Sequence, residues 1–195
     1  MKIETTEDLD KVEELSGSHP NITDPAENSN EREYFLLKDG DDTVGCGYIR
    51  VFLESIGNIG AVFIKESRRK TGAGSFLVRK LEEELEDRDI RICIIGVHED
   101  NKPARRFWEK MKYHVILESV GQNLFENEKV RELINHISPK PIPGKSVTIM
   151  GKRLGLDEHE STHIFKEFHD LKDTLKSIDI DFFGDKKEKT IKKDL

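Results

Sequence analysis

The residues with the clearest chemical use form a basic turn that contains two glycines, Arg69-Lys-Thr-Gly-Ala-Gly-Ser75. An apolar run at residues 59–64 precedes the turn and predicts a strand, and leucines spaced four residues apart follow it and predict a helix. The first backbone N–H groups of a helix have no internal partner and lie at the positive end of the helix dipole. Glycine lets the backbone approach an anion closely, and the basic side chains add positive charge. The turn therefore predicts a phosphate-binding site.

Two well-known phosphate-binding patterns do not fit this turn. The P-loop requires a lysine after its second glycine, and Ser75 follows Gly74 here. The dinucleotide-binding fingerprint requires a third glycine at the position where Leu77 stands. The pattern that remains is R-x-x-G-x-G, which is made by Arg69, Gly72 and Gly74.

A second motif follows a predicted buried strand at residues 90–97. It runs Asn101-Lys-Pro-Ala-Arg-Arg-Phe-Trp108 and opens a predicted helix, with Asn101 as the N-cap. Together with R-x-x-G-x-G, this motif makes the chain resemble the GNAT superfamily of acetyl-CoA-dependent N-acetyltransferases, in which N-x-x-A-x-x-[FL]-Y opens the helix after a strand. Asn101, Ala104 and Phe107 match that pattern, and the resemblance covers about residues 1–155.

The resemblance implies an α/β (α+β) fold, with a GNAT-like mixed, mainly antiparallel central sheet flanked by helices and a C-terminal helical extension. It implies direct transfer of an acetyl group from the co-substrate acetyl-CoA to a primary amine, which is a protein N-terminus, a lysine or a small amine. In the family the glycine-loop strand and the next strand splay apart around the pantetheine arm, and a backbone N–H near Phe63 or Ile64 supports the oxyanion. The implied cofactor-binding residues are Phe63, Ile64, Arg69, Lys70, Thr71, Gly72, Ala73, Gly74, Ser75, Asn101, Ala104 and Phe107.

The groups that transfer protons are less sharply defined. Glu66 and His98 lie at predicted strand ends and are the candidate catalytic residues that take the amine's proton, although each is also interpretable as a solvated charge. Trp108 stands where many GNAT enzymes carry a tyrosine that protonates the leaving thiolate. Indole is a hydrogen-bond donor only, so we expect Trp108 to fill the core. Lys112-Tyr113 replaces the family's Gly-Phe, so we expect this helix to end in a different way.

Two other functions compete with this interpretation. The first is an acyl-CoA-binding module without turnover. The second is a zinc metalloprotease, because His159-Glu160-Ser-Thr-His163 has the H-E-x-x-H spacing that places two histidines on one helix face. The longer pattern of such proteases requires glycine where Lys166 stands, and on a continuous helix His169 points away from the other two histidines. We therefore expect no metal site.

Composition and charge narrow the class of protein. The chain has 195 residues, of which 36% are charged, a mean hydropathy of -0.63 and a net charge of -7. This charge disfavours nucleic-acid binding and mildly favours cationic acceptors. No apolar run is long enough to span a bilayer and the N-terminus has no signal-peptide pattern, so we expect no membrane association. Cys46 and Cys93 make no disulfide framework, which favours a cytoplasmic location.

Periodicity predicts the elements that position these motifs. A strand at residues 2–4 is followed by a helix that Thr5 or Thr6 caps, with Leu9 and Val12 facing inward. A three-stranded meander follows. Its first two strands are antiparallel and joined by a turn, and its third strand, at residues 59–64, is preceded by a second turn. The two strands lie at residues 33–37 and 44–53, the turns at 40–43 and Gly57-Asn58, and later strands at 113–120 and 147–154.

We expect one GNAT-like domain over residues 1–155, with a helical and Pro-rich insertion at about 122–145 on the acceptor side. Residues 16–30 predict a loop, with no clear second helix to define the acceptor pocket. Residues 156–195 predict an amphipathic helix and a Lys-rich tail. That helix packs either on its own domain, which we favour, or on a second subunit, so a homodimer stays open.

Overall fold

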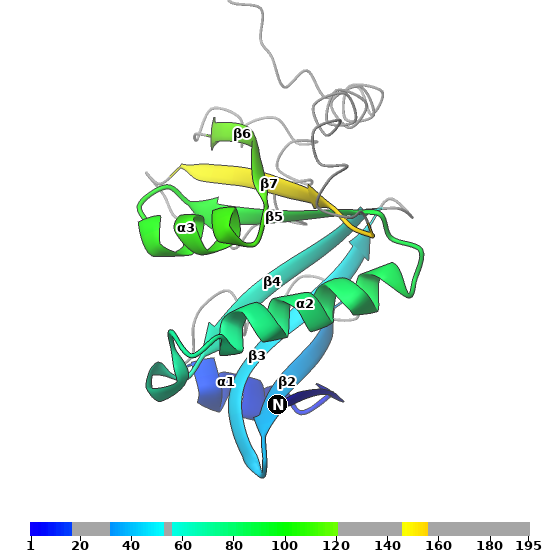
Figure 1. The fold of residues 1–195 in the computed structure, drawn as a ribbon, viewed down its shortest axis with the longest axis vertical. Helices are drawn as coiled ribbons and strands as arrows, with labels where there is room; N and C mark the ends of the chain where they lie inside the picture. Colours follow the sequence, from blue (N-terminus) through cyan, green and yellow to red (C-terminus); the bar gives the residue numbers. More distant parts are fainter. Residues whose placement is uncertain (17–31, 53–55, 121–145, 156–195) are drawn as a thin grey trace, which may run out of the picture.

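A computed structural model describes residues 1–16, 32–52, 56–120 and 146–155 of the protein. These residues form a seven-stranded sheet of order β1-β2-β3-β4-β5-β7-β6 (Figure 1). Every neighbouring pair of strands is antiparallel except β4 and β5, so the predicted mixed, mainly antiparallel sheet is confirmed. The elements are β1 (Lys2–Thr6), α1 (Leu9–Ser16), β2 (Glu33–Asp39), β3 (Asp42–Phe52), β4 (Ile56–Ile64), a 3₁₀ turn (Glu66–Arg68), α2 (Ala73–Glu86), β5 (Ile92–His98), α3 (Lys102–Lys110), β6 (His114–Val120) and β7 (Val147–Arg153).

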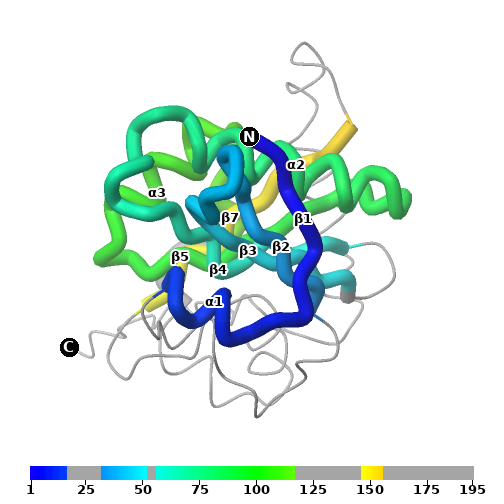
Figure 2. Tube along the Cα trace, turned by 90° about the horizontal axis from the view of Figure 1, so that it is seen from below, coloured from blue at the N-terminus to red at the C-terminus, as the bar shows by residue number. Residues whose placement is uncertain are grey.

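Helices cover both faces of the sheet. α2 and α3 lie on one face and α1 lies on the other (Figures 1 and 2). The main core lies between α2 and the sheet, where Leu77, Leu81 and Leu85 are fully buried, as their four-residue spacing predicts. Burial of each such side chain contributes roughly 2 kcal/mol to the stability of the fold. The three leucines therefore fix α2, and with it the glycine turn that precedes it, on the sheet.

β2 divides its side chains between the two faces. Phe35 and Leu37 pack in the main core, whereas Tyr34 and Leu36 pack in a smaller cluster with Val12 of α1. Successive side chains of a strand point to opposite faces, so a shift of one residue in register would exchange the two clusters. The two cores therefore fix the register of the N-terminal half of the sheet.

The turn between β2 and β3 is shorter than predicted. Asp39 pairs with Asp42, which leaves Gly40 and Asp41 as the connection instead of residues 40–43. Gly40 has a φ of +63°, a left-handed conformation that glycine adopts without strain. The predicted turn composition was correct, but two of its residues pair as strand.

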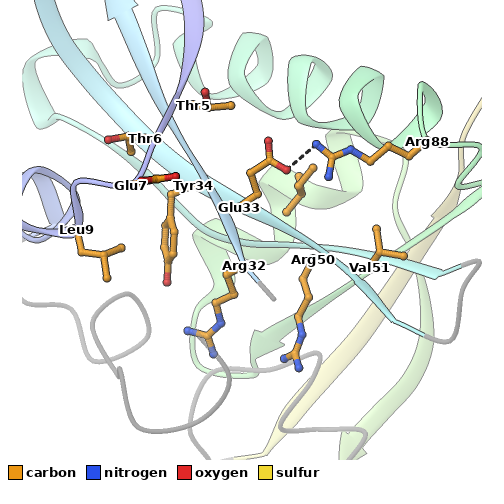
Figure 3. A pocket seen from close by; sticks show the side chains of 11 residues that line it. Thr5, Thr6, Glu7, Leu9, Arg32, Glu33, Tyr34, Arg50, Val51 and Arg88 are labelled. Atoms are coloured by element: carbon orange, nitrogen blue, oxygen red, sulfur yellow. Dashed lines mark ion pairs between the residues drawn. The ribbon is translucent and has the colours of Figure 1, made fainter. Parts of the chain in front are cut away.

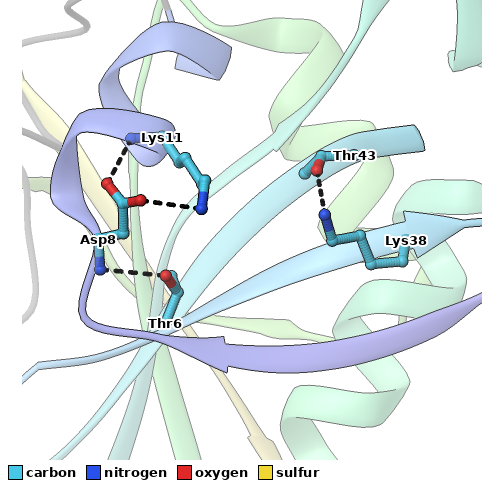
Figure 4. A network of polar contacts seen from close by, with 5 residues as sticks. All are labelled: Thr6, Asp8, Lys11, Lys38 and Thr43. Atoms are coloured by element: carbon cyan, nitrogen blue, oxygen red, sulfur yellow. Dashed lines mark hydrogen bonds and ion pairs between the residues drawn. The ribbon is translucent and has the colours of Figure 1, made fainter. Parts of the chain in front are cut away.

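The residue that caps α1 differs from the predicted threonines. The Asp8 carboxylate accepts a hydrogen bond from the Lys11 backbone N–H at 3.2 Å and pairs with the Lys11 Nζ at 2.9 Å (Figure 4). Thr6 instead ends β1, and its hydroxyl accepts a hydrogen bond from the Asp8 N–H at 3.1 Å. Val12 is buried as predicted, but Leu9 is 39% exposed because it lies at the first turn of a helix that begins later than expected.

β4 begins earlier than predicted. The strand starts at Ile56, so Gly57 and Asn58 are strand residues and the predicted turn is wrong. The reason for the glycine is packing: a Cβ at Gly57 would lie 2.8 Å from the Leu85 methyl carbons and 3.1 Å from Ile90. Glycine here lets α2 and the chain after it lie directly against the strand.

β6 and β7 form the expected closing hairpin, and β7 lies between β5 and β6. The predicted insertion at 122–145, the C-terminal helix, the H-E-x-x-H segment and nearly all of the predicted loop at 16–30 lie outside the described residues. Within the ranges that are described, no helix is long and apolar enough to cross a membrane. Those same ranges contain no group of three or more His, Cys, Asp or Glu side chains placed to hold a metal ion.

Candidate functional site

The candidate site is a split between the two parallel strands of the sheet. β4 and β5 pair only from Ile56 to Asn58 and from Ile92 to Ile94, and then diverge toward their carboxyl ends (Figure 1). The other edge of β4 is paired with β3, and the other edge of β5 is paired with β7 along its whole length. The edges that face each other across the split are therefore unpaired by any described strand. Such edges bind extended ligands through main-chain hydrogen bonds.

Asn58 marks the apex of the split. Its side chain is fully buried, and its Nδ2 donates a hydrogen bond to the Ile94 carbonyl at 2.8 Å, across the last paired position of the two strands. The bond joins β4 to β5 at the point beyond which backbone pairing stops. We did not anticipate this role from the sequence, although a polar residue within the apolar run from Ile56 to Ile64 was a signal for it.

A β-bulge lies just beyond the apex. Tyr48 pairs with Gly60 and Cys46 pairs with Phe63, so two residues of β4 stand opposite one residue of β3. Ala61, within the bulge, has a φ of +49°. An extra residue bends a strand and increases its twist, and bulges are frequent beside active sites. The bulge thus accounts for the way β4 turns away from β5.

The glycine loop is fastened to the end of β4 by its own side chains. The Arg69 Nε donates to the Ile64 carbonyl at 3.1 Å, and the guanidinium lies 5.7 Å from the centre of the Phe63 ring. The Thr71 hydroxyl donates to the Arg68 carbonyl at 2.7 Å. Arg69 and Thr71 therefore shape the loop, and Lys70 is exposed within it at a φ of +62°.

The amino end of α2 is open. Gly72 is the N-cap residue with a φ of +92°, and no side chain of the described residues caps the helix. The first helical hydrogen bond runs from the Phe76 N–H to the Gly72 carbonyl, so the N–H groups of Ala73, Gly74 and Ser75 precede it at the positive end of the helix. Apart from Gly72 and its two chain neighbours, no atom of the described residues lies within 4 Å of the position that a Cβ on Gly72 would occupy. The loop has the donors and the space that an anion needs.

The two sequence motifs meet at Gly74. A Cβ on this glycine would lie 3.4 Å from the Phe107 ring of α3 and 3.6 Å from Ile64 at the end of β4. The predicted N-cap of α3 is confirmed, because the Asn101 Oδ1 accepts a hydrogen bond from the Ala104 N–H at 3.2 Å. The structure therefore brings the glycine loop, the carboxyl end of β4 and the start of α3 together around the open end of the split.

The two candidate proton acceptors lie at the ends of the diverging strands. Glu66 is exposed in the 3₁₀ turn that follows β4. His98 is the last residue of β5, and its carbonyl accepts a hydrogen bond from the Asn101 N–H at 2.9 Å. Their placement is thus on opposite sides of the mouth of the split and not at its apex.

Two aromatic residues near the end of α3 are core residues. Trp108 is 7% exposed, and its ring contacts Phe107 and Tyr113 edge-on with centroids 5.3 and 4.9 Å away. The Tyr113 hydroxyl donates to the Cys93 Sγ at 3.3 Å, and burial raises the pKa of this phenol well above its usual range. Lys112 has a φ of +68°, so α3 ends on a left-handed residue in the ordinary way and the expectation of a different helix end is wrong.

Several solved structures of similar fold are acetyltransferases. A GNAT family acetyltransferase from Elizabethkingia anophelis with acetyl-CoA bound is 15% identical, with a TM-score of 0.58 over 78% of this chain and 97% of that one. The ribosomal-protein-S18-alanine N-acetyltransferase from Escherichia coli is 14% identical, with a TM-score of 0.57 over 80% and 95%. A Bacillus subtilis acetyltransferase in complex with CoA is 18% identical, with a TM-score of 0.59 over 78% and 98%. At such identities the likeness shows the fold alone.

No curated protein matches the chain. A family model does, and its description is "Acetyltransferase (GNAT) family". The match runs from residue 3 to residue 113 and so includes β1 from its second residue onward, β2 to β5, the glycine loop and all of α3. Because it spans more than half of the 195 residues, the protein belongs to the GNAT family of acetyltransferases.

Proposed function

We propose that the protein is an N-acetyltransferase that moves the acetyl group of acetyl-CoA to a primary amine. The observation that carries the proposal is the split between β4 and β5, which leads from the uncapped amino end of α2 to an apex closed by Asn58. A linear ligand with a phosphate group at one end and a reactive group at the other matches this path. The glycine loop would bind the pyrophosphate, and the pantetheine arm with its thioester would lie in the split beside the end of β4.

Three groups of residues have separate tasks in this proposal. The N–H groups of Ala73, Gly74 and Ser75 bind the pyrophosphate with Lys70, while Arg69 and Thr71 hold the loop in shape. The facing edges of β4 and β5 pair with the amide groups of the pantetheine arm. A backbone N–H near Phe63 or Ile64 stabilises the oxyanion, and Asn101, Ala104 and Phe107 close the site from α3. Backbone donors of this kind stabilise developing charge without reorganisation.

The reaction needs few side chains. The neutral amine attacks the thioester carbonyl carbon, a C–N bond forms, and the C–S bond breaks with departure of CoA as a thiolate. The proton that the amine loses passes to Glu66 or His98, directly or through water, and the thiolate is protonated from solvent. Trp108 is buried and its indole is a donor only, so it cannot take the place of a phenol that protonates the thiolate. Because solvent supplies that proton in this proposal, a phenol at position 108 is not required.

The proposal extends to the location, the domain limits and the alternative function of the protein. We place the protein in the cytoplasm, because Cys46 and Cys93 are both buried free thiols. We assign residues 1–155 to the catalytic domain and residues 156–195 to an appendage that covers the domain or joins a second subunit. The alternative of an acyl-CoA-binding module without turnover is compatible with the same split and differs only in the chemical step.

Calorimetry followed by a thiol-release assay tests the proposal. Acetyl-CoA should bind with one site per chain, and addition of a panel of amines should release free CoA thiol in proportion to acetylated product. Binding without thiol release for any amine would favour the non-catalytic module. Absence of binding would contradict the assignment of the split.

A further inference from the structure

The carboxyl end of β4 presents different side chains to the two faces of the sheet. Ile64 packs against the main core, and its Cγ1 lies 3.6 Å from the position that a Cβ on Gly74 of the glycine loop would occupy. Phe63 packs against the smaller cluster, which contains Val12 of α1. The start of α2 therefore lies on the Ile64 side of the strand, and Phe63 lies on the side away from it.

The backbone of β4 shows which of these two residues can serve a ligand. The Lys65 N–H donates to the Val44 carbonyl of β3 at 2.9 Å. The Phe63 carbonyl oxygen also points to β3, because it lies 2.6 Å from the position that a Cβ on Gly45 would occupy. Ile64 lies between these two residues, and bonded and non-bonded positions alternate along antiparallel strands, so Ile64 directs its N–H and its carbonyl away from β3. Of the two candidate oxyanion donors, the Ile64 N–H is therefore the one that faces the split.

Arg69 binds the carbonyl that Ile64 directs at the split. The Arg69 Nε donates to this oxygen at 3.1 Å, and the guanidinium lies 5.7 Å from the centre of the Phe63 ring. The contact with Phe63 places the charged end of Arg69 on the α1 face of β4, across the strand from Gly74. Arg69 therefore acts on the backbone at the end of the split as well as on the shape of the loop.

An unbonded carbonyl at this place would oppose the reaction. The N–H and the carbonyl of one strand residue point to the same side, so an oxyanion bound by the Ile64 N–H lies next to the Ile64 carbonyl oxygen. These two oxygens repel each other, and the repulsion is stronger where water is excluded. A charge-assisted hydrogen bond from a guanidinium draws negative charge from the carbonyl and adds a positive charge nearby. Groups that are held in place in this way stabilise a transition state, because they need no rearrangement as the charge develops.

We propose that Arg69 is a positioning residue for acetyl transfer, because it engages the Ile64 carbonyl and so allows the Ile64 N–H to act as the oxyanion donor. The proposal rests on the acetyltransferase function proposed above and deepens it. When the amine nitrogen attacks the thioester carbon, one electron pair of the C=O bond moves to the oxygen, which the Ile64 N–H binds. The pair returns as the C–S bond breaks, and the sulfur leaves with the electrons of that bond. Arg69 transfers no proton.

Two substitutions of equal length separate the hydrogen bond from the other roles of Arg69. Glutamine carries an amide nitrogen at the same number of bonds from Cα as the arginine Nε, so Arg69→Gln keeps a donor for the Ile64 carbonyl. Methionine has the same length and no donor, so Arg69→Met removes the bond. We expect Arg69→Met to lower kcat about 10- to 100-fold, which is less than the effect of removing an oxyanion donor outright. Arg69→Gln should lower kcat only about 3-fold, since it loses the charge and not the bond.

The measurement uses the full chain and follows release of the CoA thiol at saturating concentrations of both substrates. The acceptor is whichever of three amines reacts fastest: the peptide amide Ala-Ala-Ala-Ala, the N-acetylated peptide amide Ala-Lys-Ala, or spermidine. These amines represent a protein N-terminus, a lysine and a small amine. Calorimetry gives the acetyl-CoA affinity in parallel, and this affinity should fall by a smaller factor than kcat in Arg69→Met. A residue that only shapes the loop would change the affinity and not kcat at saturation.

Arg68 supplies the matched control. It is the neighbouring arginine, and it pairs with Asp39 of β2 at 3.1 Å. Arg68→Met and Arg68→Gln should both leave kcat within about 3-fold of the parent, because a partly exposed ion pair contributes little. Arg69 is exposed, so its variants should fold, which thermal melting checks, and Arg69→Ala replaces Arg69→Met if that variant does not. A folded Arg69→Met protein with the kcat of the parent would overturn the proposal.

The failures of the two proposals are distinguishable. If acetyl-CoA binds and none of the three amines is acetylated, the acetyltransferase function fails, and the role of Arg69 fails with it. If the parent acetylates an amine and Arg69→Met is equally fast, the function stands and only the role of Arg69 is wrong. Equal losses of kcat in Arg69→Met and Arg69→Gln would show that the bond to the Ile64 carbonyl is not what matters, which also overturns the proposal. Weaker acetyl-CoA binding with unchanged kcat in both variants would assign Arg69 to the phosphate groups of CoA instead.

Discussion

The paired end and the split end of β4 and β5 use polar side chains in opposite ways. At the paired end, Glu82 of α2 is 5% exposed and holds the Lys152 Nζ of β7 at 2.8 Å, while the Tyr113 hydroxyl donates to Cys93 Sγ nearby. At the split end, the glycine loop is exposed and no side chain of the described residues caps the first N–H groups of α2. Polar groups at the paired end bind one another within the fold, and those at the split end are the ones that the proposed function assigns to the ligand.

The paired end is a low-dielectric environment. Burial raises the pKa of Glu82 above its ordinary value of 4.5, against the opposing hydrogen bond and charge of Lys152. Burial also raises the pKa of the Cys93 thiol to about 12. The thiol is therefore neutral near pH 7 and poorly reactive. Changes at this end should alter stability, and changes at the split end should alter binding.

The largest expected effect breaks the split end. Gly72→Asp places a carboxylate and a Cβ where the pyrophosphate would lie, so acetyl-CoA affinity by calorimetry should fall about 100-fold or more. Gly40→Asp is the matched control, because Gly40 also has a positive φ, +63°, and no atom of the described residues beyond its own chain neighbours lies within 4 Å of its Cβ position. That variant should suffer the same backbone strain and bind normally. Arg69→Ala should weaken binding less, since Arg69 mainly holds the loop.

A second change breaks the paired end. Lys152→Ala leaves Glu82 buried without its cation, so the free energy of unfolding measured with urea should fall by about 3 kcal/mol. Acetyl-CoA affinity should be unchanged. Lys80→Ala is the control, because Lys80 pairs with Glu83 at the surface and its loss should change stability by less than about 1 kcal/mol. Equal effects of the two variants would show that the Glu82–Lys152 pair is not a special feature of the core.

The pH dependence of stability sharpens the same point. A carboxyl whose pKa is raised in the folded state binds its proton more tightly there than in the unfolded chain. Its contribution to the free energy of unfolding is therefore greatest at low pH. That contribution declines as pH rises from about 4.5 through the folded pKa. Glu82→Gln should remove this decline. Between pH 4 and pH 7 the parent should therefore lose stability relative to Glu82→Gln, as measured by the difference between their free energies of unfolding. A shift in the opposite direction would mean that Lys152, and not burial, governs the pKa of Glu82.

Trp108 lies between the two ends and should behave as a core residue. Trp108→Phe should lower the free energy of unfolding by roughly 1–2 kcal/mol, because the ring packs against Phe107 and Tyr113. The value of kcat should stay within about 3-fold of the parent, a difference of less than 1 kcal/mol in the barrier. A large fall in kcat with unchanged stability and acetyl-CoA affinity would instead assign catalysis to the indole N–H.

The smallest expected effect concerns the end of α3. Lys112 has a φ of +68°, which is strained for any residue with a Cβ. Lys112→Gly should therefore raise the free energy of unfolding by about 0.5–1 kcal/mol. Arg106→Gly, the same kind of change at an exposed position inside α3, should lower it by about 1 kcal/mol. Destabilisation by both changes would contradict the left-handed helix end.

The sequence allowed prediction of features that depend on local pattern. The leucine stripe of α2, the N-cap at Asn101 and the glycine loop are each encoded within a few consecutive residues. The apex residue Asn58 was missed because Gly57-Asn58 has the composition of a turn, and only packing against Leu85 shows why glycine is there. A prediction from local pattern is wrong where the residue type is determined by packing against a residue that is distant in the sequence.

The buried Glu82–Lys152 pair at the paired end was not predicted, for the same reason. Glu82 and Lys152 are 70 residues apart in the chain, and each belongs to an element whose periodicity leaves a polar side chain unremarkable. A hollow of about 990 Å³ is likewise lined by residues of β1, α1, β2 and β3 and by Arg88 after α2 (Figure 3). A buried charge pair and a charged hollow depend on the register of several strands, which the order of residues within one strand does not reveal.

Hydrogen–deuterium exchange with and without acetyl-CoA tests the central claim most directly, because it reads the backbone of β4 and β5 residue by residue. If the pantetheine arm pairs across the split, acetyl-CoA should slow exchange at residues 59–64, at 95–98 and at the first turn of α2. Exchange at residues 92–94, where β5 is already paired with β4, should not change. Binding of acetyl-CoA without protection of the facing edges beyond Asn58 would contradict the claim that the split is the acyl-CoA site.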